Sequence, residues 1–460
     1  MLAYDLKALS APLPEDIQRL KEAGCFQEAL YTIEARLSSE RTPDALKKRL
    51  ILEREIIKRI PANYPFPEEA VQKRLSEVIA DYQEKELALL LQEGGFEWIF
   101  IEGKRYFHKL FLENLLKTRR AYAARCTDPS LLQDAKRNRE LLCESMLRAK
   151  ENGSRKVHFH LRVSLRLTEE GIRKYKGKTL RAYLPLPVEY AQVHDYRLLS
   201  ISPLPKAVAG AQYPQRTAVF EAVCTGEERF SAEFSFDNIT DYQDPGPEDV
   251  LFAQPAFYLG EEEPHIRFTP YLRALCREII GGETNPLLKA RRIYDYITTH
   301  VQYSYVRPYS TFSAIPEFVA SSLKGDCGFQ ALLFITLCRI AGVPARWQSG
   351  LYATPYEVGC HDWAQYYVAP YGWLYADCSF GGAAYRQGDE ERRVFYGANL
   401  DPYRIPQASE FQHGFVVPEG AFRADPYDNQ DGEIICGGEA LLPGADFVTE
   451  HEMLELSEIF

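Results

Sequence analysis

The segment that most constrains the fold is residues 324 to 350, KGDCGFQALLFITLCRIAGVPARWQSG, where one cysteine stands at the start of an almost wholly apolar helix. Asp326 precedes Cys327, and Gly342 and Pro344 end the apolar run, as helix-stop residues do. We therefore expect Cys327 in the first helical turn, where free backbone N–H groups and the helix dipole lower the pKa of a thiol. Cys338 lies inside the same helix, has no such help, and is predicted to be a core thiol.

A thiolate nucleophile needs a general base, and the base needs an acceptor that orients it. In the stretch HDWAQYYVAPYGWLYADCSF, His361 opens an alternating strand, APYG is a turn, and WLYAD is a returning strand that leads to Asp377. Such a hairpin brings Asp377 back near His361. The order of Cys327, His361 and Asp377 therefore predicts a catalytic triad.

These residues resemble the transglutaminase-like superfamily of cysteine enzymes. Its motif is a Gly-x-Cys helix start, then aGVPAR, a His-x-Trp strand and an Asp strand, which stand here in order as GDC, AGVPARWQSG, HDWAQYYV and GWLYAD. The resemblance covers roughly residues 265 to 400. It implies a papain-like core with Cys327 as nucleophile, His361 as general base and then acid, and Asp377 as the residue that orients the imidazole. It also implies an acyl thioester that water or an amine resolves.

The oxyanion of such a reaction needs hydrogen-bond donors, and the backbone N–H of Cys327 is the natural first one. Animal transglutaminases use a tryptophan upstream of the cysteine as the second donor, but residues 300 to 326 contain no tryptophan. Tyr303 and Tyr305 are the phenolic donors available there. A tyrosine in such a position is more often a core or interface ring than a catalytic donor.

Three further side chains are candidates for the surroundings of the site. Trp347 and Gln348 follow the cysteine helix and are expected to line the cleft. Trp363 comes two residues after His361 and so shares its face of the strand. There it either shields the ion pair from water or packs in the core.

The rest of the chain divides by the spacing of its apolar residues. Residues 1–150 have helical spacing, with a hairpin inset that turns at Glu102–Gly103, and residues 155–250 alternate as the strands of a β-sandwich. Residues 255–405 hold the core, and residues 406–460 are predicted to be an acidic, loop-rich extension. The fold class is therefore α+β, with an α-helical N-terminal domain, a β-sandwich-like domain and a papain-like transglutaminase core.

Composition and charge narrow the class of function. The net charge of -11 disfavours a nucleic-acid binder, which needs a basic face to neutralise phosphates. No apolar run reaches the roughly 18 residues of a membrane helix, and the first residues do not resemble a signal peptide. The ten cysteines are sparse and include no CxxC pair. We therefore expect a cytoplasmic enzyme with reduced thiols and no membrane partner.

Metal sites are the alternative reading of several residues. Cys360 and Cys378 adjoin two members of the triad, which suggests zinc, but adjacent strand residues point to opposite faces. His158 and His160 have the spacing of ligands on one strand face, with no third ligand nearby. We therefore expect neither a metal nor another cofactor.

Hydrolysis of an amide or peptide bond is the expected reaction, because water is always present and nothing in the sequence indicates an amine site. The expected substrate is a peptide, a protein or a small amide. A protein-glutamine amine transferase that cross-links proteins is the alternative. A catalytically silent interaction scaffold is the alternative of another class, and an intact triad argues against it.

Overall fold

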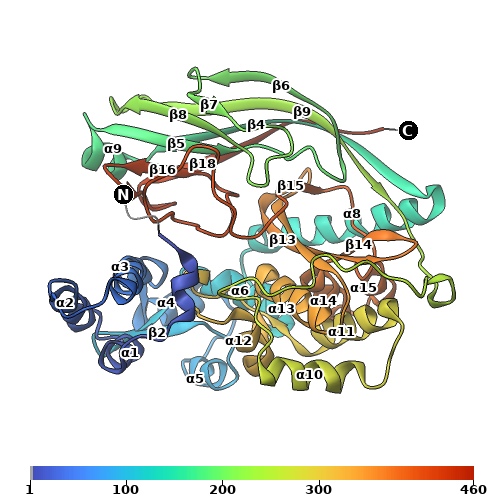
Figure 1. Ribbon diagram of the computed structural model, residues 1–460, viewed down its shortest axis with the longest axis horizontal. Coiled ribbons are helices and arrows are strands. Elements are labelled where there is room, and N and C mark those ends of the chain that lie inside the picture. Colours follow the sequence, from blue (N-terminus) through green and yellow to red (C-terminus); the bar gives the residue numbers. More distant parts are fainter. Residues whose placement is uncertain (1–3, 460) are drawn as a thin grey trace.

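The computed structural model describes residues 4–459, apart from the side chain of Gln133. Two facing β-sheets lie above a mixed core of helices and strands, and a group of helices lies beside that core (Figure 1). The α+β class predicted from the sequence is therefore confirmed. Within residues 4–459, no helix is long and apolar enough to cross a membrane.

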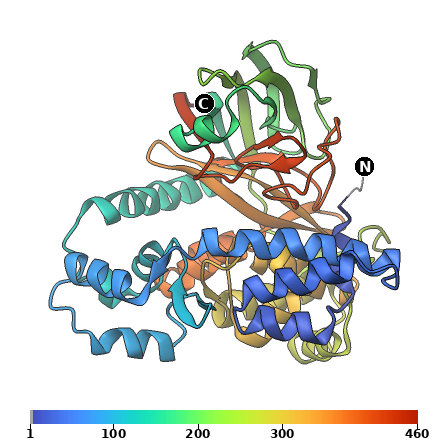
Figure 2. The ribbon, with the colours of Figure 1, turned by 90° about the vertical axis from the view of Figure 1, so that its left-hand side faces the viewer.

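The N-terminal region is helical, as its apolar spacing predicts, and lies against the core (Figure 2). The predicted hairpin is also present, and it turns where Glu102 and Gly103 adopt φ values of 46° and 78°. The elements are η1 (Leu6–Ser10), α1 (Glu15–Glu22), α2 (Phe26–Leu37), α3 (Asp44–Arg59), η2 (Ile60–Asn63), β1 (Phe66–Pro67), α4 (Glu68–Val78), α5 (Lys85–Gln92), β2 (Trp98–Ile101), β3 (Lys104–Phe107), α6 (Phe111–Thr118), α7 (Arg120–Ala123) and α8 (Ser130–Asn152).

Two sheets form the β-sandwich and share one apolar core. Its longest strand alternates as predicted, since Val157, Phe159, Leu161 and Val163 are all buried. The first sheet has the order β18 (Phe447–Glu458), β4 (Ser154–Leu167), β9 (Arg229–Asp241), β6 (Val193–Ser202). The second has the order β17 (Glu439–Ala440), β16 (Glu433–Cys436), β5 (Thr179–Pro185), β8 (Thr217–Val223), β7 (Ala207–Val208), and α9 (Glu169–Tyr175) joins β4 to β5.

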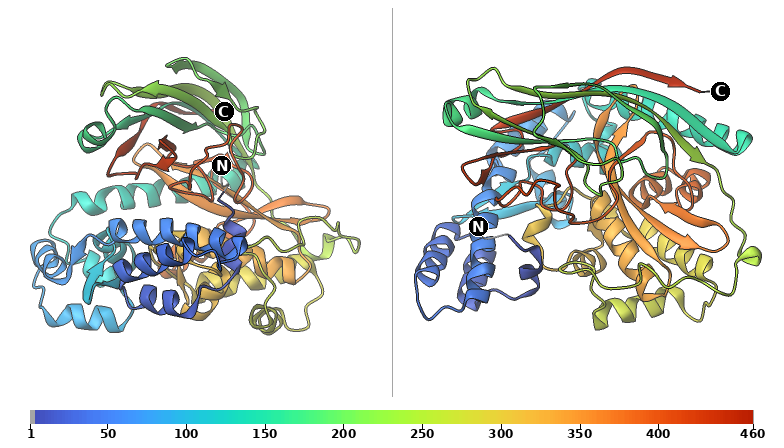
Figure 3. Two further views of the ribbon diagram at one scale, coloured as in Figure 1. Left: turned by 60° about the vertical axis from the view of Figure 1, so that its left-hand side comes forward. Right: turned by 45° about the horizontal axis from the view of Figure 1, so that its top comes forward.

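The C-terminal residues only partly form the predicted loop-rich extension, because residues 409–432 form no helix or strand but residues 433–458 contain β16, β17 and β18. β16 pairs with β5, and β18 pairs with β4 along almost its whole length, as Figure 3 shows for the red C-terminal strand. The acidic residues of β18 find arginines across the strand pair: Arg166 pairs with Glu450, Arg162 with Glu452 and Arg155 with Glu458. Charge that resembles a solvated surface in the sequence therefore marks a complementary strand.

The core consists of an antiparallel sheet packed against helices. The sheet has the order β14 (Gly372–Ala376), β13 (Val358–Val368), β12 (Ala345–Ala353), β15 (Arg404–Ala408). The helices are η3 (Pro247–Asp249), α10 (Pro270–Ile280), α11 (Pro286–His300), η4 (Tyr309–Thr311), α12 (Ile315–Ser322), α13 (Cys327–Ile340), α14 (Cys378–Arg386) and α15 (Glu390–Phe395). A short parallel pair, β10 (Gln302–Tyr303) and β11 (Lys324–Gly325), leads into α13.

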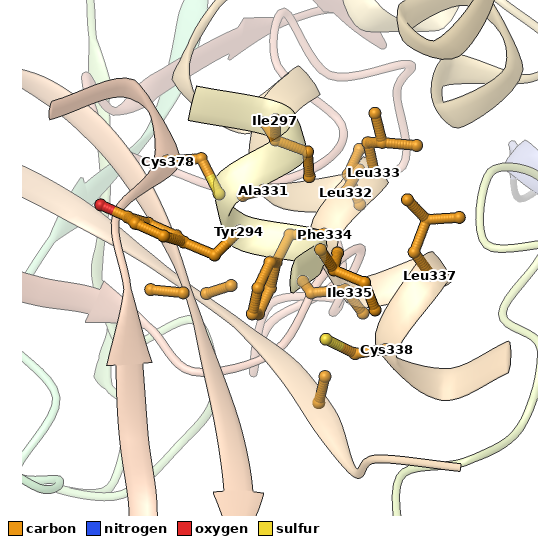
Figure 4. Close-up of a cluster of buried hydrophobic side chains, with 14 of the residues drawn as sticks. Tyr294, Ile297, Ala331, Leu332, Leu333, Phe334, Ile335, Leu337, Cys338 and Cys378 are labelled. Atoms are coloured by element: carbon orange, nitrogen blue, oxygen red, sulfur yellow. The ribbon is translucent and has the colours of Figure 1, made fainter. Parts of the chain in front are cut away.

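Helix α13 is surrounded by protein because it is apolar on every side. Every residue from Gly328 to Arg339 is buried, and Phe334 packs against Tyr366 of β13 with ring centroids 5.7 Å apart. Figure 4 shows Cys338 among these apolar side chains, which confirms it as a core thiol. The buried helix fixes the place of the residue that begins it, Cys327.

Candidate active site

Helix α13 begins at Cys327 because Asp326 caps it. The Asp326 Oδ1 atom accepts the backbone N–H of Phe329 at 3.0 Å and the Tyr309 hydroxyl at 2.7 Å. Position 328, directly after the cysteine, must be glycine, since a Cβ there would lie 2.1 Å from the Tyr309 oxygen. This tight packing holds the first turn in place and leaves the Cys327 side chain partly exposed.

The β13–β14 hairpin brings His361 and Asp377 together, as the sequence predicts. Both side chains are buried, and His361 Nε2 lies 2.8 Å from Asp377 Oδ2. Asp377 directly follows β14 and also caps α14, where its Oδ1 accepts the backbone N–H of Phe380 at 3.0 Å. One carboxylate thus stabilises a helix and orients the imidazole. Because Nε2 donates to Asp377, Nδ1 is the nitrogen left to exchange a proton with a thiol.

Arg404 of β15 completes a buried charge network with this pair. Its guanidinium donates to Asp377 Oδ2 and to Asp401 Oδ1, each at 3.1 Å, and lies 4.0 Å from the centre of the Phe380 ring. Burial alone would raise the pKa of Asp377, but the charges of His361 and Arg404 hold that pKa well below its usual range. Burial lowers the pKa of His361, so the imidazole is neutral near pH 7 and can accept a proton.

The Cys327 thiol donates to Asp362 Oδ2 over 3.5 Å, and in this structure its hydrogen bond does not go to His361. The backbone N–H of Asp362 also acts on the sulfur, which lies against the peptide that joins His361 to Asp362. Burial, followed by the charges of Asp362 and Asp326, raises the pKa of Cys327 well above its usual range. This is the opposite of the shift that the helix start predicts, because burial and then the charges of two carboxylates outweigh the effect of the helix.

Asp362 is a site residue that the sequence analysis missed, although its position between His361 and Trp363 could have indicated it. Strand alternation turns its side chain away from the face of His361 and toward α13, where a Cβ on Gly328 would lie 2.5 Å from Oδ2. Burial, then the charge of Asp326, raises the pKa of Asp362 to about 7. Near neutral pH this carboxyl group therefore exchanges its own proton.

Gln430 is the second residue that sequence reasoning missed. It comes from the long loop between β15 and β16, and its side-chain amide donates to Asp362 Oδ1 at 2.8 Å and to the His361 carbonyl at 2.9 Å. It also reaches the Gly350 carbonyl of β12 at 3.1 Å. No local pattern indicates such a role. The amide therefore holds the part of β13 that carries His361 and Asp362.

The two tyrosines proposed as oxyanion donors lie next to the start of α13. β10 pairs in parallel with β11, which aligns Tyr303 with Gly325, two residues before Cys327. Tyr303 is buried, and its ring meets that of Tyr305 edge-on at 5.5 Å. Burial, then the charge of Cys327, raises the pKa of Tyr305 to about 12, so its hydroxyl remains a donor at neutral pH.

The remaining predicted side chains have distinct positions. Trp347 lies over the first turn of α13, where a Cβ on Gly328 would approach its ring to 2.9 Å. Trp363 stacks on His361 with ring centroids 5.9 Å apart and covers the imidazole. Gln348 accepts the indole N–H of Trp363, so it orients that ring and is not directed at the thiol.

The two histidines considered as metal ligands pair with carboxylates, and the two cysteines differ in their exposure to solvent. His158 pairs with Asp237 at 2.6 Å and His160 with Glu233 at 2.9 Å, both across the β4–β9 strand pair. Cys360 is exposed, whereas Cys378 is buried. Over the described part of the chain, no group of three or more His, Cys, Asp or Glu side chains is arranged to hold a metal ion.

Comparison with known proteins identifies the segment that carries this geometry. Residues 273–378 match the family model of the transglutaminase-like superfamily, and this range includes Cys327, His361 and Asp377. A curated protein of Haemophilus influenzae, itself uncharacterized, is 25% identical over 158 residues. That alignment covers 28% of this chain and 42% of the relative, so less than half of the relative's length is matched.

Solved structures give more distant likenesses. A proposed cysteine protease from Cytophaga hutchinsonii is 15% identical, with 66% of this chain and 98% of that chain covered and a TM-score of 0.42. The periplasmic domain of TgpA from Pseudomonas aeruginosa is 14% identical, with 50% of this chain and 97% of that domain covered and a TM-score of 0.28. Both scores are too low to support an inference about function.

Proposed function

We propose that this chain, whose residues 273–378 form a transglutaminase-like core, is a cysteine enzyme that hydrolyses an amide or peptide bond. The observation that supports this best is the buried pair of His361 and Asp377, 2.8 Å apart, beside the helix that begins with Cys327. A neutral imidazole with one nitrogen oriented by a carboxylate is the base that a thiol nucleophile needs.

In the proposed mechanism the thiol first gives up its hydrogen bond to Asp362 and takes His361 as its partner. His361 Nδ1 takes the thiol proton, and the sulfur attacks the carbonyl carbon of the substrate. The backbone N–H of Cys327 stabilises the oxyanion. The imidazolium then gives its proton to the leaving nitrogen, which departs as an amine and leaves an acyl thioester.

Deacylation uses the same residues in reverse order. His361 takes a proton from water, and the resulting hydroxide attacks the thioester carbonyl. The intermediate collapses with release of a carboxylic acid, and the imidazolium returns its proton to Cys327. Asp377 and Arg404 keep their ionisation states throughout, which agrees with the low pKa of that carboxylate.

Hydrolysis is favoured over amine transfer because the Cys327 side chain is partly exposed, so water can reach a thioester there. The substrate class, a peptide, protein or small amide, belongs to the proposal. So does a cytoplasmic location, which rests on the sparse cysteines of the sequence.

Mass spectrometry of peptide mixtures, incubated with and without a labelled primary amine, tests the proposal. We expect Cys327-dependent hydrolysis, complete loss in Cys327→Ala and near-complete loss in His361→Ala. Asp377→Ala should keep a weak residual rate, because it orients the base without touching the substrate. Cys25→Ala, which changes a partly exposed thiol at the start of α2, is the matched control and should leave the rate unchanged.

The two alternatives give different results in the same assay. Cys327-dependent incorporation of the amine, with no hydrolysis of any peptide, would replace the hydrolase by a transferase. A wild-type protein with neither product, whose Cys327 reacts with iodoacetamide no faster than Cys25, would support the silent scaffold.

A further inference from the structure

The helical N-terminal region supplies a lysine to the neighbourhood of Cys327. Helix α6 contacts the segment that leads to α13, because Asn114 of α6 accepts the backbone N–H of Tyr305 at 3.0 Å. Lys117 is one turn further along the same helix and so lies on the same face. Its ammonium nitrogen is 4.0 Å from the centre of the Tyr303 ring and 5.5 Å from that of Tyr305.

Tyr303 connects this ammonium group to the candidate nucleophile. The ring belongs to the residue that pairs with Gly325 in the β10–β11 ladder, two residues before Cys327. Burial lowers the pKa of Lys117, and the charge of Cys327 is the largest of the influences that oppose this. The Lys117 charge also acts on His361. The ammonium group is therefore within electrostatic reach of both the thiol and the imidazole.

The ammonium group has hydrogen-bonding capacity that the protein does not use. A lysine ammonium carries three N–H donors, and the Tyr303 ring occupies only one side of it. The neighbouring Arg119 and Arg125 pair with Glu93 and Glu86, but Lys117 makes no ion pair or hydrogen bond within residues 4–459. Its side chain is exposed although the surrounding protein partly desolvates its charge.

An exposed, partly desolvated cation next to a nucleophile is suited to hold an anionic group of a substrate. We propose that Lys117, positioned by the Tyr303 ring, binds a carboxylate of the substrate. The enzyme then prefers peptides that carry a carboxylate, from an acidic side chain or a free C-terminus, close to the amide that Cys327 attacks. This inference rests on the proposed function and adds the class of substrate to it.

A carboxylate fits the surroundings better than a more highly charged group. Asp326 and Asp362 lie beside the thiol, so a phosphate with two negative charges would be repelled more strongly than a carboxylate with one. A neutral peptide would gain nothing from the ammonium group. The single charge of the Lys117 ammonium group matches one carboxylate.

The test uses two alkylating reagents, because they need no knowledge of the natural substrate. Iodoacetate and iodoacetamide differ only in a carboxylate against a carboxamide, and both report on Cys327. The rate constant of each is measured at pH 7 by mass spectrometry of the Cys327 peptide. We expect the iodoacetate to iodoacetamide ratio to fall about fivefold in Lys117→Met, the effect of one exposed ion pair.

Matched variants separate carboxylate binding from other effects of the lysine. Lys117→Arg should keep most of the ratio, and Lys73→Met, an exposed lysine on α4, should leave it unchanged. If Lys117 only stabilised the thiolate, both reagents would slow equally and the ratio would stay constant, which overturns the proposal. A wild-type Cys327 that reacts with neither reagent would instead overturn the proposed function, and the carboxylate site with it.

Peptide pairs then distinguish the two sources of the carboxylate. One pair has glutamate or glutamine next to the cleaved bond, and the other has a free or an amidated C-terminus. For the source that Lys117 recognises, Lys117→Met should lower kcat/KM of the acidic member about fivefold, mainly through KM, and leave the neutral member unchanged. An equal loss for both members of both pairs contradicts the proposal.

Discussion

Replacement of Arg404 by methionine should strongly destabilise the fold. Arg404 is fully buried and donates to two buried carboxylates, Asp377 and Asp401, at 3.1 Å each. Methionine keeps much of the side-chain volume and its contact with the Phe380 ring. The variant therefore removes charge with little loss of packing.

The expected loss of stability follows from the distances between Arg404 and the two carboxylates. Coulomb's law at 3.1 Å with an effective dielectric constant of about 20 gives about 5 kcal/mol for each pair. Desolvation of the guanidinium offsets much of this, and loss of one partner from a buried pair typically costs about 3–5 kcal/mol because the other charge stays buried. Asp377 keeps His361 and Asp401 keeps the Tyr396 hydroxyl at 2.8 Å. We therefore expect a loss of about 3–5 kcal/mol in the free energy of unfolding.

Urea denaturation at pH 7 measures this loss, and its dependence on pH tests the cause. Asp377 has a folded-state pKa below its unfolded value of about 4, so the stability that it contributes is present at neutral pH and is lost as the pH falls. The variant lacks part of this contribution, so its difference from wild type should be nearly constant from pH 7 to about pH 5 and should narrow as the pH falls below about 4. Arg166→Met, which breaks the exposed pair with Glu450, is the control and should cost less than about 1 kcal/mol. If Arg404→Met were as stable as Arg166→Met at pH 7, the inferred role of the buried network would be wrong.

Three further predictions concern the thiol and its neighbours. Asp362→Asn should lower the pKa of Cys327, because the substitution removes the charge that raises this pKa most. The pH dependence of iodoacetamide labelling measures the pKa, and an unchanged value would refute the prediction. In wild type Cys327 should react with iodoacetamide faster than the exposed Cys360, because His361 can take the Cys327 proton. Quantitative labelling should show the reverse order in His361→Ala. The same order in both proteins would contradict the role of His361 as the base. Gln430→Leu should reduce kcat at least tenfold with a smaller change in KM, since it leaves the Asp362 and His361 oxygens of the catalytic strand without their donor; wild-type kcat would exclude a positioning role.

The sequence predicts those parts of the site that depend on local pattern. Cys327 opens an apolar helix, and His361 and Asp377 lie on one hairpin, so short-range signals identify all three. Asp362 is adjacent to His361 but faces the other side of the strand, toward α13. Its effect on the thiol depends on how α13 packs against β13, which the spacing of residues does not give. The direction of the Cys327 pKa shift could not be predicted for the same reason.

Contacts between distant segments explain the remaining differences. Lys117 precedes Cys327 by 210 residues, and the sequence around it gives no sign that α6 contacts Tyr303 and Tyr305. The acidic strand β18 resembles a solvated tail until the arginines of β4 are placed opposite it. In both cases the informative partner lies far away in the sequence.

Gln430, whose amide holds the strand that carries His361, comes 69 positions after the His361 carbonyl that it binds. At a translation rate of about 5–20 residues per second, a ribosome adds this residue several seconds after the nucleophile and base have been made. During that interval the nascent chain carries all three candidate catalytic side chains without the contact that fixes their strand. Strand β5 likewise lacks its antiparallel partner β16 until the residues after Gln430 have been made. Synthesis order thus delays the assembly of the candidate site until the residues that follow β15 have been made.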